Sequence, residues 1–196
     1  AEQQRIVAKL DAAFAEIDAA IELSKKQAIS ASDYGYRIIK TTLAELSEQH
    51  GLSSLGNIAV IQPMKKLALA KLNEDDDVSF MGMDGLGIEE KYSQPKTIKK
   101  LSEVYKSYQY FEDNVKGSTN GVGFGSSEFV VLRTHATFQP EFLYYCLLDK
   151  VFRNNGADNM SGAVGHKRVT KEYFSNYTVP TPSLDVQQLI SKKFDE

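Results

Sequence analysis

The two ends of this chain carry nearly the same short sequence. Residues 3–11 read Gln-Gln-Arg-Ile-Val-Ala-Lys-Leu-Asp, and residues 187–195 read Gln-Gln-Leu-Ile-Ser-Lys-Lys-Phe-Asp. Five of these nine positions are identical, and Phe194 stands where the first copy has Leu10. A chain whose last residues repeat its first residues contains one copy of a tandem repeat and the beginning of the next copy. A repeat of this length is a stacked domain rather than a short solenoid turn.

Composition limits the classes of protein to consider. The chain has 196 residues, of which 42% are hydrophobic and 25% charged, which suits one domain with a core plus an appendage. The formal net charge of −3 excludes a uniformly basic nucleic-acid-binding surface, so phosphate binding must come from local patches. Cys146 is the only cysteine, which rules out an internal disulfide and favours a reducing, cytoplasmic location. The sequence shows no membrane span or leader, and we interpret Ala1 as an internal cut.

The first 28 residues are typical of a long helix built to pair with another helix. Apolar residues recur at steps of three and four, and charged residues fall off this stripe. The predicted interface residues are Ile6, Leu10, Phe14, Ile17 and Ile21. A second helical stretch follows and stops at Gly51. The pattern leaves open whether residues 1–50 form one rod of roughly 70 Å or two helices with a joint near Ser30.

Residues 51–182 predict a mixed α/β body, and residues 183–196 the start of a second long helix. The pattern predicts strands at 55–61, 78–81 and 128–132, a helix from Pro140 to Val151, a loop over 154–165 and extended segments at 169–173 and 177–179. Residues 101–111 are ambiguous between helix and strand. Pro180-Thr181-Pro182 predicts a rigid segment that leads into the final helix. The expected fold class is therefore α+β with a long N-terminal helix.

Two groups of basic residues are candidates for DNA binding, which needs cations for phosphates and forked donors for base edges. Lysines gather over 91–106 with tyrosines between them, and a second basic group spans 150–171. The candidate residues, including those of a Gly/Ser/Asn loop, are Lys91, Lys96, Lys99, Lys100, Lys116, Ser118, Asn120, Lys167 and Arg168. Composition alone favours solvated faces over DNA contacts for these two groups. The turn before Arg168 is either a phosphate clamp or a structural turn in which Arg168 pairs with an acid.

No catalytic constellation is evident in the sequence. The glycines of residues 121–125 do not form a dinucleotide fingerprint, and no phosphate-binding Gly-Lys-Ser/Thr loop is present. The three histidines are isolated, which argues against a zinc site or a hydrolytic triad. Glu89-Glu90-Lys91 after Asp84 only faintly matches a metal-dependent nuclease core. We therefore expect no catalytic residue, no metal and no cofactor in this chain.

An ordered set of motifs resembles one target recognition domain of the specificity (S) subunit of type I restriction-modification systems. The motifs lie at Val78–Asp84, Tyr110–Asn114, Gly123–Arg133, Met160–Val169 and Val179–Pro182, the last followed by Gln187-Gln188. The resemblance covers about residues 52 to 196, and the N-terminal helix is similar to a conserved spacer helix. Relatives usually carry a further stretch between the equivalents of Asn114 and Val115, and Gln is common where this chain has His166.

The resemblance implies a non-catalytic subunit that recognises a bipartite site in double-stranded DNA through two recognition domains held apart by two antiparallel helices. It further implies modification (methyltransferase) and restriction subunits as partners, which bind S-adenosylmethionine, ATP and Mg²⁺. The long helix could also self-associate. The alternative is a coiled-coil scaffold with a protein-binding domain and no affinity for DNA. The target sequence and the oligomeric state do not follow from these residues.

Overall fold

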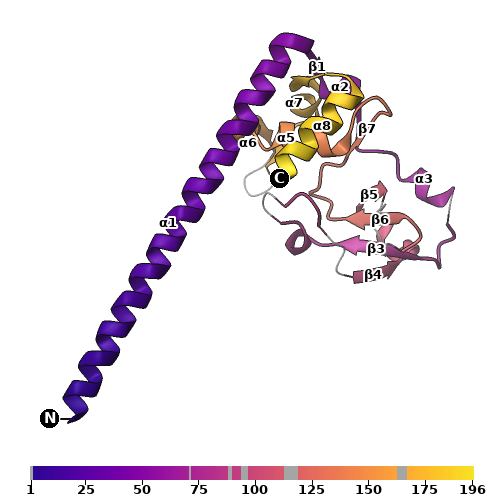
Figure 1. Ribbon diagram of the computed structural model, residues 1–196. Helices are drawn as coiled ribbons and strands as arrows, with labels where there is room; N and C mark the ends of the chain where they lie inside the picture. The colour runs from indigo at the N-terminus through magenta and orange to yellow at the C-terminus, as the bar shows by residue number, and fades with distance from the viewer. Residues whose placement is uncertain (1, 71, 88–89, 94–96, 113–118, 163–166) are drawn as a thin grey trace. The chain divides into compact units, whose positions relative to one another are not determined.

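The computed structural model describes residues 2–70, 72–87, 90–93, 97–112, 119–162 and 167–196. The chain divides into two compact units, Ala1–Thr42 and Leu43–Glu196. The first unit is the greater part of one helix, and the second contains the strands and the other helices (Figure 1). Among the described helices, none combines the length and the apolar character needed to cross a membrane.

Helix α1 runs without interruption from Glu2 to His50, which settles the question of a joint near Ser30. Serine lowers helix propensity only slightly, and this stretch contains no proline. A Cβ placed on Gly35 would meet no atom within 4 Å, so this glycine serves no close packing. The helix stops at Gly51, whose φ of 75° is left-handed and whose N–H donates to the carbonyl of Ser47 at 3.0 Å. This is the C-terminal glycine stop that the sequence predicted.

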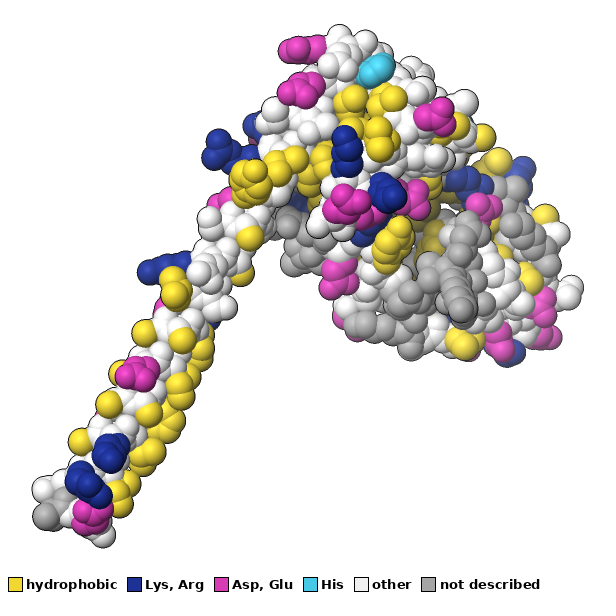
Figure 2. All heavy atoms as spheres, viewed as in Figure 1, with side chains coloured by type: hydrophobic (Ala, Val, Ile, Leu, Met, Phe, Trp, Pro, Cys, Tyr) yellow, Lys and Arg dark blue, Asp and Glu magenta, His cyan; other side chains and the backbone are white. Residues whose placement is uncertain are grey.

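The first unit exposes the apolar stripe that the sequence predicted for a helix interface. The five residues Ile6, Leu10, Phe14, Ile17 and Ile21 are between 47% and 59% exposed. Figure 2 shows apolar side chains following one another along this part of α1. A helix with such a stripe is stable in water when another surface covers the stripe.

The second unit has two hydrophobic cores. The first core gathers the end of α1 with α2 (Leu55–Ile58), α5 (Pro140–Leu147) and α8 (Leu184–Asp195), and its buried members include Leu46, Leu55 and Phe142. Two antiparallel pairs of short strands lie at the edge of this core. Strand β1 (Leu52–Ser54) pairs with β10 (Thr178–Pro180), and β2 (Ala59–Ile61) pairs with β7 (Leu132–Thr134).

The second core lies against a four-stranded sheet. Its strand order is β4-β3-β6-β5, with β3 at Asp77–Met81, β4 at Thr97–Lys100, β5 at Gln109–Glu112 and β6 at Val122–Gly125. Strands β3 and β6 are parallel, and the other pairs are antiparallel. Val78, Tyr110 and Phe124 alternate onto one face, where α4 (Leu101–Val104) completes the core. The ambiguous segment 101–111 is thus a helical turn followed by a strand.

The remaining elements are short. They are α3 (Lys66–Leu69), the 3₁₀ turn η1 (Met83–Gly85), α6 (Lys150–Asp158), β8 (Met160–Ser161), β9 (Arg168–Val169) and α7 (Lys171–Asn176). Strands β8 and β9 form an antiparallel pair. The chain then enters α8 after Pro182, as the sequence predicted. Helix α1 ends at His50 and α8 begins at Leu184. The division of the chain into domains at residues 50 and 182 stays a prediction.

Two predicted strands were partly wrong. Leu55–Ile58 forms a helical turn because Leu55 and Ile58, three residues apart, are both buried in the first core. Over 128–131 the side chain of Gln62 replaces a neighbouring strand. Its amide nitrogen donates to the Phe129 carbonyl at 2.9 Å, and its amide oxygen accepts from the Val131 N–H at 3.4 Å. The Gln62 N–H also donates to the Val131 carbonyl at 2.8 Å, so Gln62 bonds to this segment without a regular ladder, and strand β7 begins only at Leu132.

The helical boundaries after Pro140 also differ from the prediction. Helix α5 ends at Leu147, and α6 starts anew behind Asp149, whose carboxylate accepts from the Val151 N–H at 2.9 Å. Helix α6 continues to Asp158, into the segment predicted as a loop. Of the segment predicted as extended over 169–173, Val169 belongs to strand β9, but α7 begins at Lys171, because the Thr170 hydroxyl accepts from the Tyr173 N–H at 3.2 Å and caps the helix.

Candidate nucleic-acid interface

Lys99 and Lys100 lie on β4, an outer strand of the four-stranded sheet. The Lys99 ammonium is 4.2 Å from the centre of the Phe80 ring and 5.8 Å from that of Tyr108. The two rings meet edge to face, with their centres 4.9 Å apart. Because aromatic faces attract cations, the rings hold this half-buried lysine in a defined position. Tyr108, one of the tyrosines interleaved with the lysines in the sequence, therefore helps to position this charge.

Lys100 carries a charge that an acid partly compensates. Its ammonium lies 2.7 Å from an Asp77 carboxylate oxygen, and both side chains are half exposed. The hydrogen bond with Asp77 raises the pKa of Lys100, so the lysine is charged at neutral pH. Exposed pairs of this kind contribute little to stability because water screens them. A phosphate can therefore compete with Asp77 for this lysine.

The residues that follow the predicted DNA-binding loop are tied to β3. The Thr119 N–H donates to the buried Ser79 hydroxyl at 3.2 Å, and the Asn120 side-chain nitrogen donates to the Asp77 carbonyl at 2.8 Å. Asn120 adopts a left-handed φ of 58°, which asparagine tolerates. Its amide thus has a structural partner within the domain. Lys116 and Ser118 lie outside the described residues.

Arg168 pairs with an acid, which was one of the two alternatives that the sequence left open. Its Nε donates to a Glu128 carboxylate oxygen at 2.6 Å, and a terminal nitrogen donates to the other oxygen. These hydrogen bonds raise the pKa of Arg168. Both side chains remain well exposed, so the fork is also accessible from solvent. Lys167, the residue before it, is exposed as well.

Lys91 is a predicted DNA contact whose side chain is largely buried. Its side chain is 13% exposed, and its ammonium donates to both Asp195 oxygens at 2.6 and 2.7 Å. The same ammonium lies 5.0 Å from the centre of the Tyr145 ring. Lys91 therefore joins the segment before the sheet's outer strand to α8 and α5, and a phosphate would have to displace a carboxylate to reach it. Lys96 lies outside the described residues.

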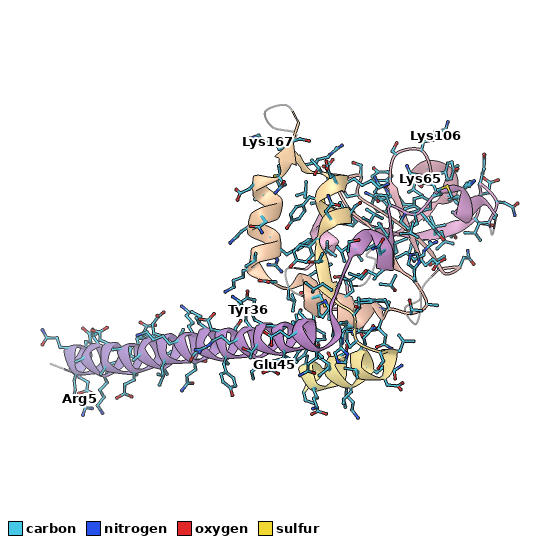
Figure 3. The ribbon with its side chains drawn as sticks, turned by 90° about the horizontal axis from the view of Figure 1, so that it is seen from above. Arg5, Tyr36, Glu45, Lys65, Lys106 and Lys167 are labelled. Carbon is cyan, nitrogen blue, oxygen red and sulfur yellow. The ribbon has the colours of Figure 1, made fainter. Side chains whose placement is uncertain are left out.

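The basic residues that the structure describes lie at more than one place on the domain. Lys65 donates to the carbonyl of Lys106 at 3.2 Å, which brings a further lysine next to the 91–106 group. Sequence reasoning missed Lys65 because it lies more than twenty residues before that group. Figure 3 shows Lys167 well separated from Lys65 and Lys106 within the domain. A single duplex would have to contact these positions along an extended surface.

A cleft of about 1020 Å³ lies over the second face of the sheet and reaches α6 and α7. Two of its lining residues, Phe111 and Phe129, pack over glycines of β6. A Cβ on Gly123 would lie 2.2 Å from the Phe111 ring, and one on Gly125 would lie 2.5 Å from the Phe129 ring. The cleft is largely apolar, and its lining includes Lys91, Lys167 and Arg168 from both predicted groups. The Gly-x-Gly pattern of β6 is the sequence signal that could have indicated it.

Asp195 should give the domain a defined acid sensitivity. Hydrogen bonds from Lys91 and then from the Tyr145 hydroxyl lower the pKa of Asp195. A carboxylate with a lowered pKa stabilises the fold above its unfolded pKa of about 4, and this contribution disappears as pH falls through the folded value. The Tm difference between wild type and Asp195→Asn should therefore be largest near pH ~7 and vanish toward pH ~2. Thermal unfolding across this range checks it.

The neighbouring exposed carboxylate of Glu196 provides the matched control for this measurement. Glu196→Gln should leave the melting temperature within about 1 °C of wild type at each pH, because exposed substitutions away from such contacts change stability little. A wild-type advantage over Asp195→Asn that stays constant down to acid pH would contradict the role of the carboxylate charge.

Comparison with known proteins places the chain in a family. The family described as "Type I restriction modification DNA specificity domain" matches residues 49–196, well over half of the chain. The chain therefore belongs to this family, the one whose motifs it was found to resemble. The match covers nearly all of the second unit.

Two curated relatives are specificity subunits of Escherichia coli, from the type I restriction enzymes EcoEI and EcoAI. Each is 26% identical over 171 residues, which cover 78% of this chain and 28% of the relative. The chain thus spans less than a third of the length of these relatives.

Solved structures share the fold. The crystal structure of the HsdS subunit from Thermoanaerobacter tengcongensis matches with a TM-score of 0.52 at 18% identity, over 99% of this chain and half of that one. A chain from a structural study of assembly and conformational transition of a type I R-M system matches with a TM-score of 0.55 at 17% identity, over the same shares. Together with the long helix, these similarities confirm the predicted α+β class.

Proposed function

We propose that this chain is a sequence-specific DNA-recognition module and acts as the non-catalytic specificity subunit, or part of it, of a type I restriction-modification enzyme. The family match over the second unit is the observation that carries the proposal. The accessible basic residues support it, because Lys99, Lys167 and Arg168 present charges on an otherwise acidic chain. Lysines of this kind contact phosphates, while a forked arginine can also read guanine.

In this proposal the reactions belong to partner subunits. Modification subunits would methylate DNA with S-adenosylmethionine, and a restriction subunit would cleave it with ATP and Mg²⁺. The exposed stripe of α1 supports a further role as a spacer that pairs with a second long helix. The assembly would work in the cytoplasm. The buried Cys146, with a pKa raised by desolvation, suits such a setting because it is an unreactive thiol.

A salt titration tests DNA binding. The assembly that contains this chain is mixed with a pool of random-sequence duplexes, and its affinity is measured by fluorescence anisotropy between about 50 and 200 mM salt. We expect the logarithm of the affinity to fall linearly with the logarithm of the salt concentration, by about 0.9 for each phosphate contacted. Absence of binding at the lowest salt concentration would reject the proposal.

A further inference from the structure

Strands β8 and β9 form a short ribbon at the surface of the second unit. They pair antiparallel, Met160 with Val169 and Ser161 with Arg168. Both residues of β8 and Arg168 of β9 are exposed. The other two-stranded pairs, β1–β10 and β2–β7, each contain buried residues. An exposed two-stranded ribbon is one of the elements that the major groove of B-DNA admits.

Arg168 is the basic residue of this ribbon, and Glu128 holds its guanidinium along one edge. Nε donates to one carboxylate oxygen at 2.6 Å, and Nη2 donates to the other. These two nitrogens form the side edge of the guanidinium, so the pair is joined by two parallel hydrogen bonds. Such a fork restricts the rotamers of a long side chain that would otherwise be free to move in solvent.

Glu128 is itself held by neighbouring serines. Its N–H donates to the Ser126 hydroxyl at 3.3 Å, and one of its carboxylate oxygens accepts from the Ser127 hydroxyl at 3.3 Å. The Ser126 N–H in turn donates at 3.2 Å to the carbonyl of Met81, the last residue of β3. The carboxylate is thereby connected to the four-stranded sheet, and it ties the Arg168 guanidinium to that sheet.

The pair leaves the end edge of the guanidinium available. Arginine has five N–H donors, and the bonds to Glu128 use one on Nε and one on Nη2. Among the described residues Nη1 has no hydrogen-bond partner, and the Arg168 side chain is 61% exposed. One N–H of Nη1 and the second N–H of Nη2 point the same way, as a bidentate contact to O6 and N7 of guanine requires. A carboxylate on the side edge and a guanine on the end edge can therefore bind the same arginine together.

The charge of Glu128 decides between the two DNA groups that this edge could contact. A phosphate is an anion, and the neighbouring carboxylate would repel it and offset the attraction of the arginine. The O6 and N7 acceptors of guanine belong to a neutral base, so Glu128 opposes them far less. Lys167, which is exposed and for which no acidic partner is found among the described residues, is better suited to a phosphate.

We propose that Arg168 reads a guanine in the major groove and that Glu128 is its positioning residue. The inference rests on the proposed DNA recognition and adds one base to it. The DNA sequence that this chain recognises contains a G·C pair, whose guanine accepts from the end edge of Arg168 through O6 and N7. The neighbouring Lys167 contacts a phosphate at the border of the same groove.

Sequence preference measures the base contact. The assembly that contains this chain is mixed with random-sequence duplexes, and the bound duplexes are sequenced. Arg168→Ala should lose the preference for one guanine of the wild-type motif and keep the rest. Its affinity for that motif should fall roughly 5- to 150-fold, as expected for one bidentate base contact, with the salt dependence unchanged. Lys167→Ala is the matched control, because it also removes one cation. It should weaken binding to all sequences alike and reduce the salt dependence by about one unit.

A modified base and a second variant test the contact and its support. 7-Deazaguanine pairs as guanine does but has a C–H group in place of N7. At the selected position it should weaken wild-type binding about 10-fold, the value of one hydrogen bond, and leave binding by Arg168→Ala unchanged. Glu128→Gln should lower the preference for the same guanine several-fold although it removes no cation. Glu172→Gln, at an exposed glutamate of α7, is its control and should leave the motif unchanged.

Three results would overturn the inference. They are an unchanged motif in Arg168→Ala, a relaxed position that is not a G·C pair, and an equal effect of 7-deazaguanine on wild type and Arg168→Ala. Each of them, with sequence-specific binding by wild type, leaves the proposed function intact. Absence of DNA binding at the lowest salt concentration refutes both. Arg168 and Glu128 are exposed, so both variants should fold, and circular dichroism verifies this.

Discussion

Reversing four cations should abolish most of the DNA affinity. Lys99→Glu, Lys100→Glu, Lys167→Glu and Arg168→Glu in one chain should weaken binding at least about 100-fold at ~0.1 M salt, because each removes a cation from the DNA interface and adds repulsion. The salt dependence should become shallower by about one unit for each phosphate that is no longer bound. Anisotropy titrations of the assembly with duplex DNA measure both quantities. Helix pairing through the exposed stripe of α1 should survive, because the four positions belong to the second unit and the stripe to the first.

The matched control reverses the same number of charges elsewhere. Lys9→Glu, Lys26→Glu, Lys192→Glu and Lys193→Glu change four exposed lysines on α1 and α8, so the net charge falls equally. This variant should lose several-fold less affinity than the first, since only long-range repulsion acts, and salt screens it. Equal losses in the two variants would show that net charge, not these four positions, governs binding. Unchanged affinity in the first variant would remove these residues from the interface.

Truncating Phe124 should cause the largest loss of stability among single substitutions in the sheet. Phe124 is fully buried at the centre of the second core, where its ring lies 5.9 Å from that of Tyr110. Phe124→Ala removes a large apolar side chain and leaves a cavity, which typically costs about 3–5 kcal/mol. Urea unfolding followed by circular dichroism measures the change in the free energy of unfolding.

A residue on an outer strand of the same sheet gives the comparison. Ile98 on β4 is as apolar as a core residue but 63% exposed. Ile98→Ala should cost less than about 0.5 kcal/mol, because a surface truncation leaves no cavity. If Phe124→Ala lowered the free energy of unfolding as little as Ile98→Ala, the second core would not belong to the part of the chain that unfolds cooperatively.

At the candidate site, the sequence shows which segments are basic, but it cannot show the partner of each charge. The basic groups were visible because charge clustering is a local property of the chain. Whether each charge is available is not local. Lys91 faces Asp195 and Arg168 faces Glu128, and these partners lie 104 and 40 residues away. The aromatic support of Lys99 likewise depends on strand register, which brings Phe80 and Tyr108 beneath it.

The same distinction explains the errors in the fold. Residues 128–131 have strand propensity, but the Gln62 side chain bonds to the backbone of Phe129 and Val131 where a strand ladder was expected. The short helix at Leu55 forms because its apolar residues meet the first core, and tertiary packing overrides propensity in so short a segment. By contrast, the start of α7 could have been predicted locally from Thr170, which caps the helix. The pattern of residues 169–173 indicated an extended segment instead.

The sequence by itself determined the long helix, its apolar stripe, the repeat and the family motifs, because these are periodic or contiguous patterns that the chain carries locally. Only the tertiary structure decided that α1 is continuous, that Phe111 and Phe129 pack over the glycine pair of β6, and that Gln187 and Asp195 hold α8 on the second unit. The physical reason is that a buried amide or carboxylate is stable only beside its partners. Here Gln187 and Asp195 find those partners in segments that the fold brings together from far along the chain.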